Sequence, residues 1–427
     1  MNVLLIGSGG REHALAYKIN ESPALNKLFI LPGNPGTQSV GENISGKADD
    51  KDFILSVCKD KNIDLVVIGP ENPLVDGLAD FLIKNNVCVF GPEKNAAEIE
   101  AHKSFSKWLM AKYNIPTASY KEFDSSLYNE AVEYLSGCNY PCVIKADGLA
   151  AGKGVIICND FQEAGTAIKD LFVKKIFGKA GEKIVIEEFL KGEEASIFAI
   201  TDGNEFVCLP AAQDHKRIGN DDTGKNTGGM GAYSPAPLIT HDILERIKRL
   251  VISPTLSALR QEGRKFAGCL YCGLMIDNGE PKVVEFNCRF GDPETQAVLP
   301  LLEGDFLKLL FSAASGKIDK QSVKYNGGAS VCVVAASKGY PDEYKTGYKI
   351  SGLSEASAEA IIFHAGTKSD GENILTNGGR VLGVTSFVAE NNLELAKEKA
   401  YKALSKISFE NIYYRTDISD KALKKSK

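Results

Sequence analysis

The sequence lacks any apolar run long enough to cross a membrane. Its longest apolar stretches, such as SVCVVAAS, are far shorter than the ~20 residues that a membrane span requires. Met1 and Asn2 lead directly into a strand-like stretch, without the basic segment that begins a secretory signal. These absences predict a cytoplasmic protein without a membrane partner.

An excess of positive charge is also missing. Lys and Arg number 50 against 55 Asp and Glu, so the formal net charge is -5, and the isoelectric point is about 5.8. Nucleic acids attract basic proteins, so no nucleic-acid partner is expected. The 427 residues exceed what one core supports, and a prior of about 150 residues per domain predicts two to four domains.

The ten cysteines form no metal-binding pattern. They are scattered through apolar runs such as YPCVIKA, where a thiol behaves as a small hydrophobe. Cys269 and Cys272 have C-x-x-C spacing, but no second pair and no nearby His completes a zinc site. They also fall in a strand-like stretch, whereas a redox pair favours a helix N-terminus. Neither role is expected.

The first hundred residues alternate short apolar strands with helical stretches. The strands are NVLLIG, KLFILPG, DLVVIGPE and VCVFGP. This alternation predicts an α/β fold with a doubly wound parallel sheet, whose ligands bind at the carboxyl ends of the strands. Ordinary turns use the same Gly, Pro and Asn residues, so each loop alone is also consistent with a plain turn. The candidate ligands in these loops are Gly9, Gly10, Arg11, Glu12, Asn34 and Glu71.

The first glycine loop does not match a dinucleotide site. That fingerprint requires glycine at position 12, where this sequence has Glu12. It also requires an acidic residue after the second strand, where Pro32-Gly33-Asn34 follows. A nicotinamide-dependent oxidoreductase is therefore disfavoured. The loop still precedes a helix N-terminus, which is typical of a single phosphate site or of a tight turn without a ligand.

A glycine-rich hairpin is expected in YPCVIKADGLAAGKGVIICND. Lysines on its first strand and in its loop can close over phosphates. It is not a P-loop, because a strand follows the lysine instead of a helix. A hairpin of small residues without a ligand is the alternative. The candidate phosphate ligands are Lys145, Gly148, Gly152, Lys153 and Gly154, with Lys103 and Lys107 on a preceding helix.

The segment YCGLMIDNGEPKVVEFNCRFGDPETQ is the most informative. Asp277-Asn278-Gly279-Glu280 predicts a turn between two strands. Glu285 and Asn287 are two residues apart, so their oxygens face the same side, and Arg289 continues that face. This set suits a hard cation that bridges phosphate oxygens, with a guanidinium on the transferring phosphoryl group. An exposed polar strand face is the alternative.

Three further segments complete the predicted organisation. PAAQDHKRIGNDDTGKNTGGMGAYSP reads as one long polar loop, of the kind that is functional or disordered. Residues 187–190 read as an exposed connector between two strands. The C-terminal third predicts a small α+β unit. Gly378-Gly379-Arg380 and Arg415 could contact substrate or cap turns, and we interpret them as turn residues.

Together these segments resemble the ATP-grasp superfamily, and within it the phosphoribosylamine–glycine ligase (glycinamide ribonucleotide synthetase) family. The blocks that carry the resemblance are GSGGREHALA, PGNPGT, GPENPLVDGL, KADGLAAGKGV, NTGGMGAYSP and RFGDPETQ. The resemblance covers essentially the whole chain. It implies an N-terminal phosphoribosylamine-binding α/β domain (1–102), an ATP-grasp domain (103–325) with a flap subdomain at about 123–190, and a C-terminal α+β domain (326–427).

The resemblance implies that ATP drives ligation of glycine to 5-phosphoribosylamine in purine biosynthesis, through glycyl phosphate, with Mg²⁺ or Mn²⁺ and as a monomer. Glu285 and Asn287 would hold the metal. Arg289 and Asp214 would act near glycine and the transferring phosphoryl group. Gly273 stands where many relatives place a further metal-binding carboxylate.

The resemblance also assigns the remaining contacts. The flap would cover the ATP phosphates, with Lys145 and one of Lys103 or Lys107 neutralising their charge. The connector backbone would contact adenine, and Glu194 would bind the ribose. The predicted adenine residues are Glu187, Glu188, Phe189 and Leu190, and the predicted substrate residues are Gly9, Gly10, Arg11, Glu12, Asn34, Glu71, Thr227 and Gly228.

Two other functions remain open beside this one. An ATP-grasp ligase or carboxylase for a different acid would share the nucleotide site. A nucleotide-sensing module without catalysis would tolerate loss of Glu285, Asn287 or Lys145, yet all three are present. ATP turnover that depends on glycine distinguishes these functions.

Overall fold

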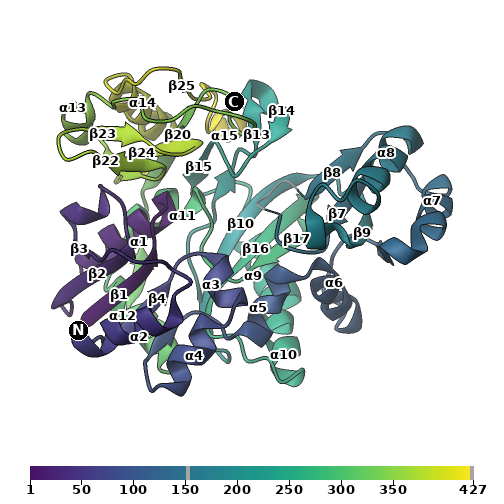
Figure 1. Cartoon of the computed structure of the whole chain (residues 1–427), viewed down its shortest axis with the longest axis horizontal. Coiled ribbons are helices and arrows are strands. Elements are labelled where there is room, and N and C mark those ends of the chain that lie inside the picture. Colours follow the sequence, from purple (N-terminus) through teal and green to yellow (C-terminus); the bar gives the residue numbers. More distant parts are fainter. Residues whose placement is uncertain (151–153, 424–427) are drawn as a thin grey trace.

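The computed structural model describes residues 1–150 and 154–423. Figure 1 shows the N-terminal elements in purple below the C-terminal elements in yellow and green, and residues 120–188 project to the right of both. The predicted flap residues Gly152 and Lys153 lie outside the described residues. The domain boundaries at residues 102 and 325 stay predictions.

The N-terminal region is the predicted doubly wound parallel sheet, with strand order β3-β2-β1-β4-β5. Leu4 and Ile6 of β1 pack into the core on one face, and Val3 and Leu5 pack into the core on the other. Strand β3 is only two residues long, which explains why no apolar run predicted it. The elements are β1 (Asn2–Gly7), α1 (Gly10–Asn20), β2 (Lys27–Pro32), β3 (Glu42–Asn43), α2 (Lys51–Asp60), β4 (Leu65–Ile68), α3 (Glu71–Val75), α4 (Leu78–Lys84), β5 (Val89–Phe90) and α5 (Lys94–Ala101).

The flap subdomain contains a four-stranded sheet in the order β6-β9-β7-β8. Strands β7 and β8 are antiparallel, with Lys145 opposite Val155, so the predicted glycine-rich hairpin is confirmed. Its apolar side chains form a core of their own beneath two helices, which makes this part a separate packing unit. The elements are α6 (Lys103–Lys112), which leads into it, β6 (Tyr120–Asp124), α7 (Tyr128–Ser136), β7 (Cys142–Ala146), β8 (Val155–Cys158), α8 (Phe161–Phe172) and β9 (Lys183–Glu188).

The central sheet has the order β11-β10-β16-β17. The predicted turn between β16 and β17 is present, and Asn278 and Gly279 adopt φ of 51° and 81°, as a type I′ hairpin turn requires. Cys269 and Cys272 are buried in β16, as expected of small hydrophobes. The elements are β10 (Glu193–Thr201), β11 (Phe206–Cys208), α9 (His241–Ile247), α10 (Ser253–Gln261), β16 (Gly268–Asp277), β17 (Glu280–Asn287), α11 (Glu294–Val298), β18 (Leu302–Gly304), α12 (Phe306–Ala314) and β19 (Val323–Tyr325).

The long polar segment is not the loop that its composition predicts. It forms β12 (Gln213–Asp214), β13 (Arg217–Gly219), β14 (Thr223–Asn226) and β15 (Gly231–Ser234). These strands are two to four residues long and rich in glycine and polar residues, so they carry no alternation that a sequence pattern can detect. Partner strands stabilise them instead, because β13 pairs with β14 and β15 pairs with β20 (Ala329–Ser337).

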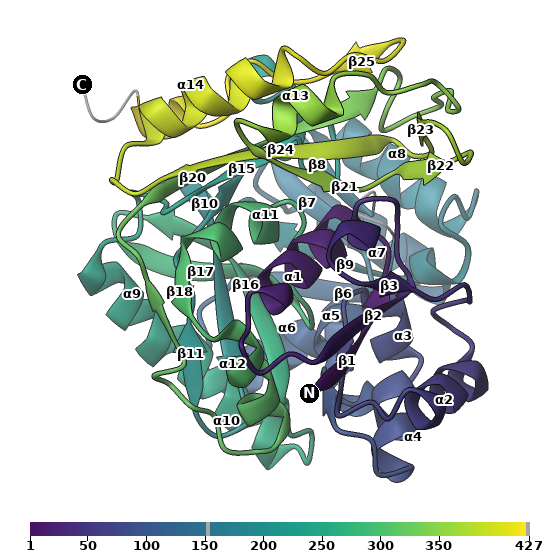
Figure 2. The ribbon, with the colours of Figure 1, turned by 90° about the vertical axis from the view of Figure 1, so that its left-hand side faces the viewer.

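The C-terminal sheet therefore continues into the central part of the chain, in the order β12-β15-β20-β24-β21. The expected α+β unit is not an independent sheet. Figure 2 shows α14 across one face of this sheet, while α1 and α11 lie against the other. The elements are β20 (Ala329–Ser337), α13 (Leu353–Ser357), β21 (Ile361–His364), β22 (Thr367–Ser369), β23 (Ile374–Thr376), β24 (Arg380–Val388), α14 (Leu393–Leu404), β25 (Ile412–Tyr413) and α15 (Asp420–Leu423).

Among the described residues, no helix combines the length and the apolar character that a membrane crossing requires.

Candidate functional site

Three lysines lie at the base of the flap, and we call Lys103, Lys107 and Lys145 the lysine cluster. The Glu187 carboxylate joins two of them: its Oε2 is 2.9 Å from Lys107 Nζ and its Oε1 is 3.0 Å from Lys145 Nζ. All three side chains of this bridge are buried. Burial lowers the pKa of Lys107 to about 8, although Glu187 partly offsets this effect.

The prediction that Glu187 and Glu188 lie in an exposed connector is wrong, because both residues lie at the end of strand β9. Strand alternation turns Glu187 toward the lysine cluster and leaves Glu188 exposed. The amide of Glu188 donates to Ser119 O. Only Phe189 and Leu190 remain in the connector, and the adenine contact stays a prediction.

The start of the flap loop is tied to helix α6. Asp147 accepts a hydrogen bond from Ser104 N at 2.6 Å, and its carbonyl accepts from Lys103 N at 3.1 Å. Lys103 Nζ lies 3.4 Å from Gly148 O. A Cβ at Gly148 would lie only 2.9 Å from the backbone of Ala180, so this position requires glycine. Gly154 O accepts from the amide of Ala146 and closes the hairpin.

Glu285 and Asn287 lie on β17, two residues apart as predicted. In the described part of the chain, neither side chain forms a hydrogen bond or an ion pair, so their oxygens are free for a ligand. Burial raises the pKa of the Glu285 carboxyl, but Lys216, Lys145 and Lys103 outweigh this effect and lower it.

Gly273 faces Glu285 across the β16–β17 pair. A Cβ at position 273 would lie 3.1 Å from Glu285 Cγ, so a side chain there would press on the carboxylate. The described residues contain no group of three or more His, Cys, Asp or Glu that could hold a metal. A cation here would therefore take two protein oxygens and complete its shell from other ligands.

Asp214 on β12 is 8% exposed. Burial raises the pKa of its carboxyl to about 7, and Lys216 only partly offsets this effect. Lys216 Nζ in turn lies 2.5 Å from Glu194 Oε2. Burial lowers the pKa of Lys216, but Glu194 and Asp214 outweigh burial and raise it well above its ordinary value. The ribose contact predicted for Glu194 stays a prediction.

Three arginines join the domains, and we call Arg11, Arg289 and Arg380 the arginine network. Arg289 Nε lies 3.2 Å from Glu71 Oε2, and its NH2 lies 2.8 Å from Glu100 Oε1. Arg11 NH1 lies 3.7 Å from the same Glu71 oxygen. Burial raises the pKa of Glu71, but Arg289 and Arg11 outweigh burial and hold it at about 2. The sequence interpretation missed Glu100, a buried acid on helix α5.

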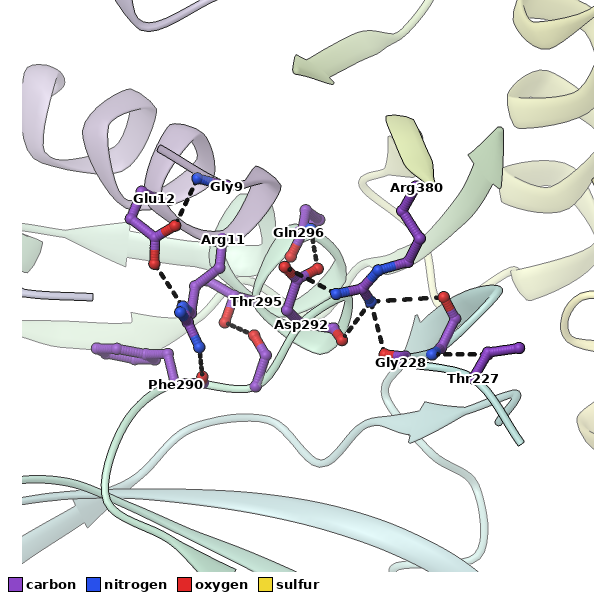
Figure 3. A network of polar contacts seen from close by, with 12 residues as sticks. Gly9, Arg11, Glu12, Thr227, Gly228, Phe290, Asp292, Thr295, Gln296 and Arg380 are labelled. Atoms are coloured by element: carbon purple, nitrogen blue, oxygen red, sulfur yellow. Dashed lines mark hydrogen bonds and ion pairs between the residues drawn. The ribbon is translucent and has the colours of Figure 1, made fainter. Parts of the chain in front are cut away.

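Glu12 caps its own helix, as Figure 3 shows. Its Oε2 accepts from Gly9 N at 2.7 Å and its Oε1 lies 2.6 Å from Arg11 Nε. A Cβ at Gly7 would lie 2.4 Å from Glu12 Cγ, so the glutamate fills the space beside that glycine. The Glu12 side chain therefore occupies space inside the glycine loop. A dinucleotide site has glycine at this position, so the structure agrees with the absence of that fingerprint.

Asn34 lies between the glycine loop and the C-terminal sheet. Its Nδ2 donates to Ser8 O at 2.8 Å and to His364 O at 2.9 Å, and its Oδ1 accepts from Gly36 N. The amide nitrogen and the amide oxygen of Asn34 therefore already form hydrogen bonds with the backbone of this chain. Asn34 links its own loop to the first glycine loop and to the C-terminal sheet. Its contact with a substrate hydroxyl stays a prediction.

The interpretation of Arg380 as a turn residue is wrong. Its side chain extends to Gly228 and Asp292 in the central part of the chain (Figure 3). Its NH1 donates to Gly228 O at 2.6 Å and to Asp292 O at 2.8 Å, and its NH2 lies 3.3 Å from Asp292 Oδ2. Gln296 Nε2 donates to Asp292 Oδ1 at 2.8 Å. Asp292 and Gln296 were missed, although their i, i+4 spacing at the start of a helix is a signal for such a pair.

Arg415 was also interpreted as a turn residue, and this interpretation is wrong. Its side chain is fully buried, and its guanidinium pairs with Asp222 at 2.9 Å and Asp417 at 2.6 Å. It fastens the β13–β14 hairpin to the C-terminal segment. A single arginine in a polar stretch of sequence gives no indication of this burial.

Family models match this chain in three consecutive segments. They describe the N domain (residues 1–100), the ATP-grasp domain (101–295) and the C domain (330–421) of phosphoribosylglycinamide synthetase. A phosphoribosylamine–glycine ligase of Leptospira interrogans is 48% identical over 99% of both chains.

Solved structures give a consistent result. The crystal structure of a phosphoribosylamine–glycine ligase from Thermotoga maritima has a TM-score of 0.85 and 34% identity, and the match covers 98% of this chain and 100% of that one. A biotin carboxylase from Campylobacter jejuni shares the fold at a TM-score of 0.70, with 14% identity over 96% of this chain and 92% of that one. The chain belongs to the phosphoribosylglycinamide synthetase family.

Proposed function

We propose that this chain uses ATP to join glycine to 5-phosphoribosylamine, giving glycinamide ribonucleotide, ADP and phosphate in purine biosynthesis. The observation that carries the proposal is the similarity to the Leptospira ligase over 99% of both chains. The site supports it as well, because Glu285 lies within electrostatic reach of Lys103, Lys145 and Lys216. This arrangement suits a triphosphate with a bound cation.

Glu285 and Asn287 would hold Mg²⁺ or Mn²⁺. A carboxylate and a carboxamide without other partners in the described chain are the oxygen donors that such ions prefer. When bound, the ion supplies positive charge that neutralises the phosphate oxygens. Because Gly273 supplies no third ligand, ATP oxygens and water would complete the shell.

In the first step, a carboxylate oxygen of glycine forms a bond to the γ-phosphorus of ATP, and the bond from that phosphorus to the bridging oxygen of ADP breaks. Lys145 and Lys103 would hold the negative charge of the phosphates. Arg289 would contribute positive charge near the transferring group. No side-chain nucleophile is required, so the chain acts by positioning and electrostatics.

In the second step, the amine nitrogen bonds to the carbonyl carbon of glycyl phosphate, and phosphate leaves. The nitrogen must lose a proton, and Asp214, with a pKa of about 7, is suited to accept it near neutral pH. Water must be excluded, because it would hydrolyse the acyl phosphate. The flap loop, with Gly148 and Gly154 at its two ends, would close over the site for this purpose.

Release of ADP by the purified protein tests the proposal. ATP and Mg²⁺ are supplied, and glycine and freshly generated phosphoribosylamine are added separately and together. We expect turnover only when both are present. Turnover with a different acid or amine, and none with this pair, would contradict the assignment and would favour another ATP-grasp ligase.

We also propose that the chain acts as a monomer in the cytoplasm, without a nucleic-acid partner. Sedimentation equilibrium at several protein concentrations would test the first point. A mass near 46.1 kDa at all concentrations is the expected result.

A further inference from the structure

Asp292 and Gln296 face the glycine loop of the N-terminal sheet. A Cβ built on Gly9 would lie 3.8 Å from Asp292 Oδ2, and one built on Gly10 would lie 2.7 Å from Gln296 Nε2. The two side chains come from the segment after β17 and from α11, so residues far apart in the sequence meet at this point. Any molecule bound by the glycine loop would lie beside the Asp292 carboxylate.

The Asp292 carboxylate retains capacity to bind a ligand. Its Oδ1 accepts from Gln296, and its Oδ2 is paired with Arg380. An ionised carboxylate offers about four lone-pair sites, so roughly two remain. Its side chain is 20% exposed, which leaves it accessible. Burial raises its pKa, but Arg380 and Arg11 outweigh burial and lower it, so the group is an acceptor at neutral pH.

Arg380 fixes this carboxylate and the neighbouring glycine segment at the same time. One guanidinium contacts the carboxylate of Asp292, the carbonyl of Asp292 and the carbonyl of Gly228. The Tyr340 hydroxyl accepts from Gly228 N at 2.9 Å, so the C-terminal region holds this segment through a second contact. A lysine in place of Arg380 would have one nitrogen for all these oxygens and could not reproduce the geometry.

We propose that Asp292 accepts hydrogen bonds from the hydroxyl or amino groups of the phosphoribosylamine, and that Arg380 is a positioning residue that holds Asp292 and Gly228 in place for this contact. The inference rests on the proposed function for the identity of the amine. It assigns recognition of a pentose phosphate to a pair formed by the central and C-terminal regions.

Steady-state kinetics of ADP release by the full chain test this inference. The concentrations of phosphoribosylamine, glycine and ATP are varied in turn for Asp292→Asn, Arg380→Lys and the control Lys225→Ala. Lys225 forms an exposed ion pair with Asp342 of the C-terminal region, and in the described part of the chain its side chain has no hydrogen bond to Asp292 or Arg380. We expect the KM for the amine to rise at least about 10-fold in both site variants, with the KM for ATP within about twofold. The control should match the wild type.

Binding of ribose 5-phosphate, measured by calorimetry, provides a second test. This probe has the phosphate and hydroxyls but no reactive amine, and we expect both site variants to bind it at least about 10-fold more weakly. An unchanged amine KM and unchanged probe binding in Asp292→Asn would overturn the inference. Equal increases in all three KM values with a lower Tm would also overturn it, since they indicate a merely structural role.

The two proposals fail in different ways. If the wild type does not turn over glycine and the amine, the proposed function fails, and ribose 5-phosphate binding still decides the role of Asp292. If Arg380→Lys does not fold, the nearly isosteric Asp292→Asn variant decides it alone.

Discussion

The lysine cluster at the base of the flap and the arginine network between the domains differ in the number of carboxylates that pair with them. The lysine cluster forms ion pairs with one carboxylate, and the arginine network forms ion pairs with four. The cluster has Glu187 as this partner, and the network has Glu12, Glu71, Glu100 and Asp292. The cluster therefore keeps an excess of positive charge for an anionic substrate. The network pairs its guanidinium groups with carboxylates of the protein and links the three domains.

The choice of residue follows from this difference. The lysine ammonium is a compact charge on a flexible stem, which suits contact with a phosphate. The arginine guanidinium is planar and carries five donors, which suits several fixed oxygens at once. Arg289 contacts two carboxylates, and Arg380 contacts one carboxylate and two carbonyls.

The largest effect is expected where the lysine cluster faces the proposed metal site. Glu285→Ala should lower the turnover number by more than about 100-fold, because it removes the one carboxylate ligand. ADP release at saturating substrates measures this. Glu280→Ala on the same strand is the control, because its side chain is 64% exposed and it should retain activity. Equal activity of both variants would contradict the metal assignment.

Glu187→Gln should break the charge balance of the cluster. Lys107 and Lys145 would remain buried without a compensating carboxylate, so the free energy of unfolding should fall by about 3 kcal/mol. Urea denaturation measures this. Glu188→Gln is a matched control on the next residue, and it should change stability by less than about 0.5 kcal/mol because its ion pair with Lys282 is exposed. A loss of similar size in both variants would argue against the buried bridge.

Glu71→Gln should test the arginine network through pH. Because the folded-state pKa of Glu71 is about 2, below the unfolded value of about 4.3, its stabilising contribution is complete above pH 5 and is lost as pH falls toward 2. The variant should lose about 1–2 kcal/mol of unfolding free energy at pH 7, an estimate reduced because the side chain is 29% exposed. Urea denaturation at pH 7 and pH 4 measures the difference, which should be smaller at pH 4. A difference independent of pH would contradict the ion pairing.

The smallest effect is expected for Lys225→Ala. Its ion pair with Asp342 joins the same two regions as Arg380 and Asp292, but both side chains are more than 60% exposed. The free energy of unfolding should change by less than about 0.5 kcal/mol. A loss above about 1 kcal/mol in thermal or urea denaturation would show that exposed ion pairs also hold the two regions together.

Local patterns predicted much of the fold and part of the site. The apolar strands of the N-terminal sheet, the glycine-rich hairpin and the turn at Asn278-Gly279 were predicted because each depends on a few adjacent residues. The shared face of Glu285 and Asn287 follows from the alternation of any strand. The short strands β12 to β15 were missed because only their partners stabilise them.

Local sequence specifies a parallel sheet, a flap hairpin and a strand that carries a carboxylate and a carboxamide side by side. Which charged side chains meet depends on how the three domains pack. Arg380 and Asp292 are 88 residues apart, and Arg289 and Glu71 are 218 apart. Such pairs depend on long-range packing of the three domains, and local periodicity carries no information about which distant partner packing will provide.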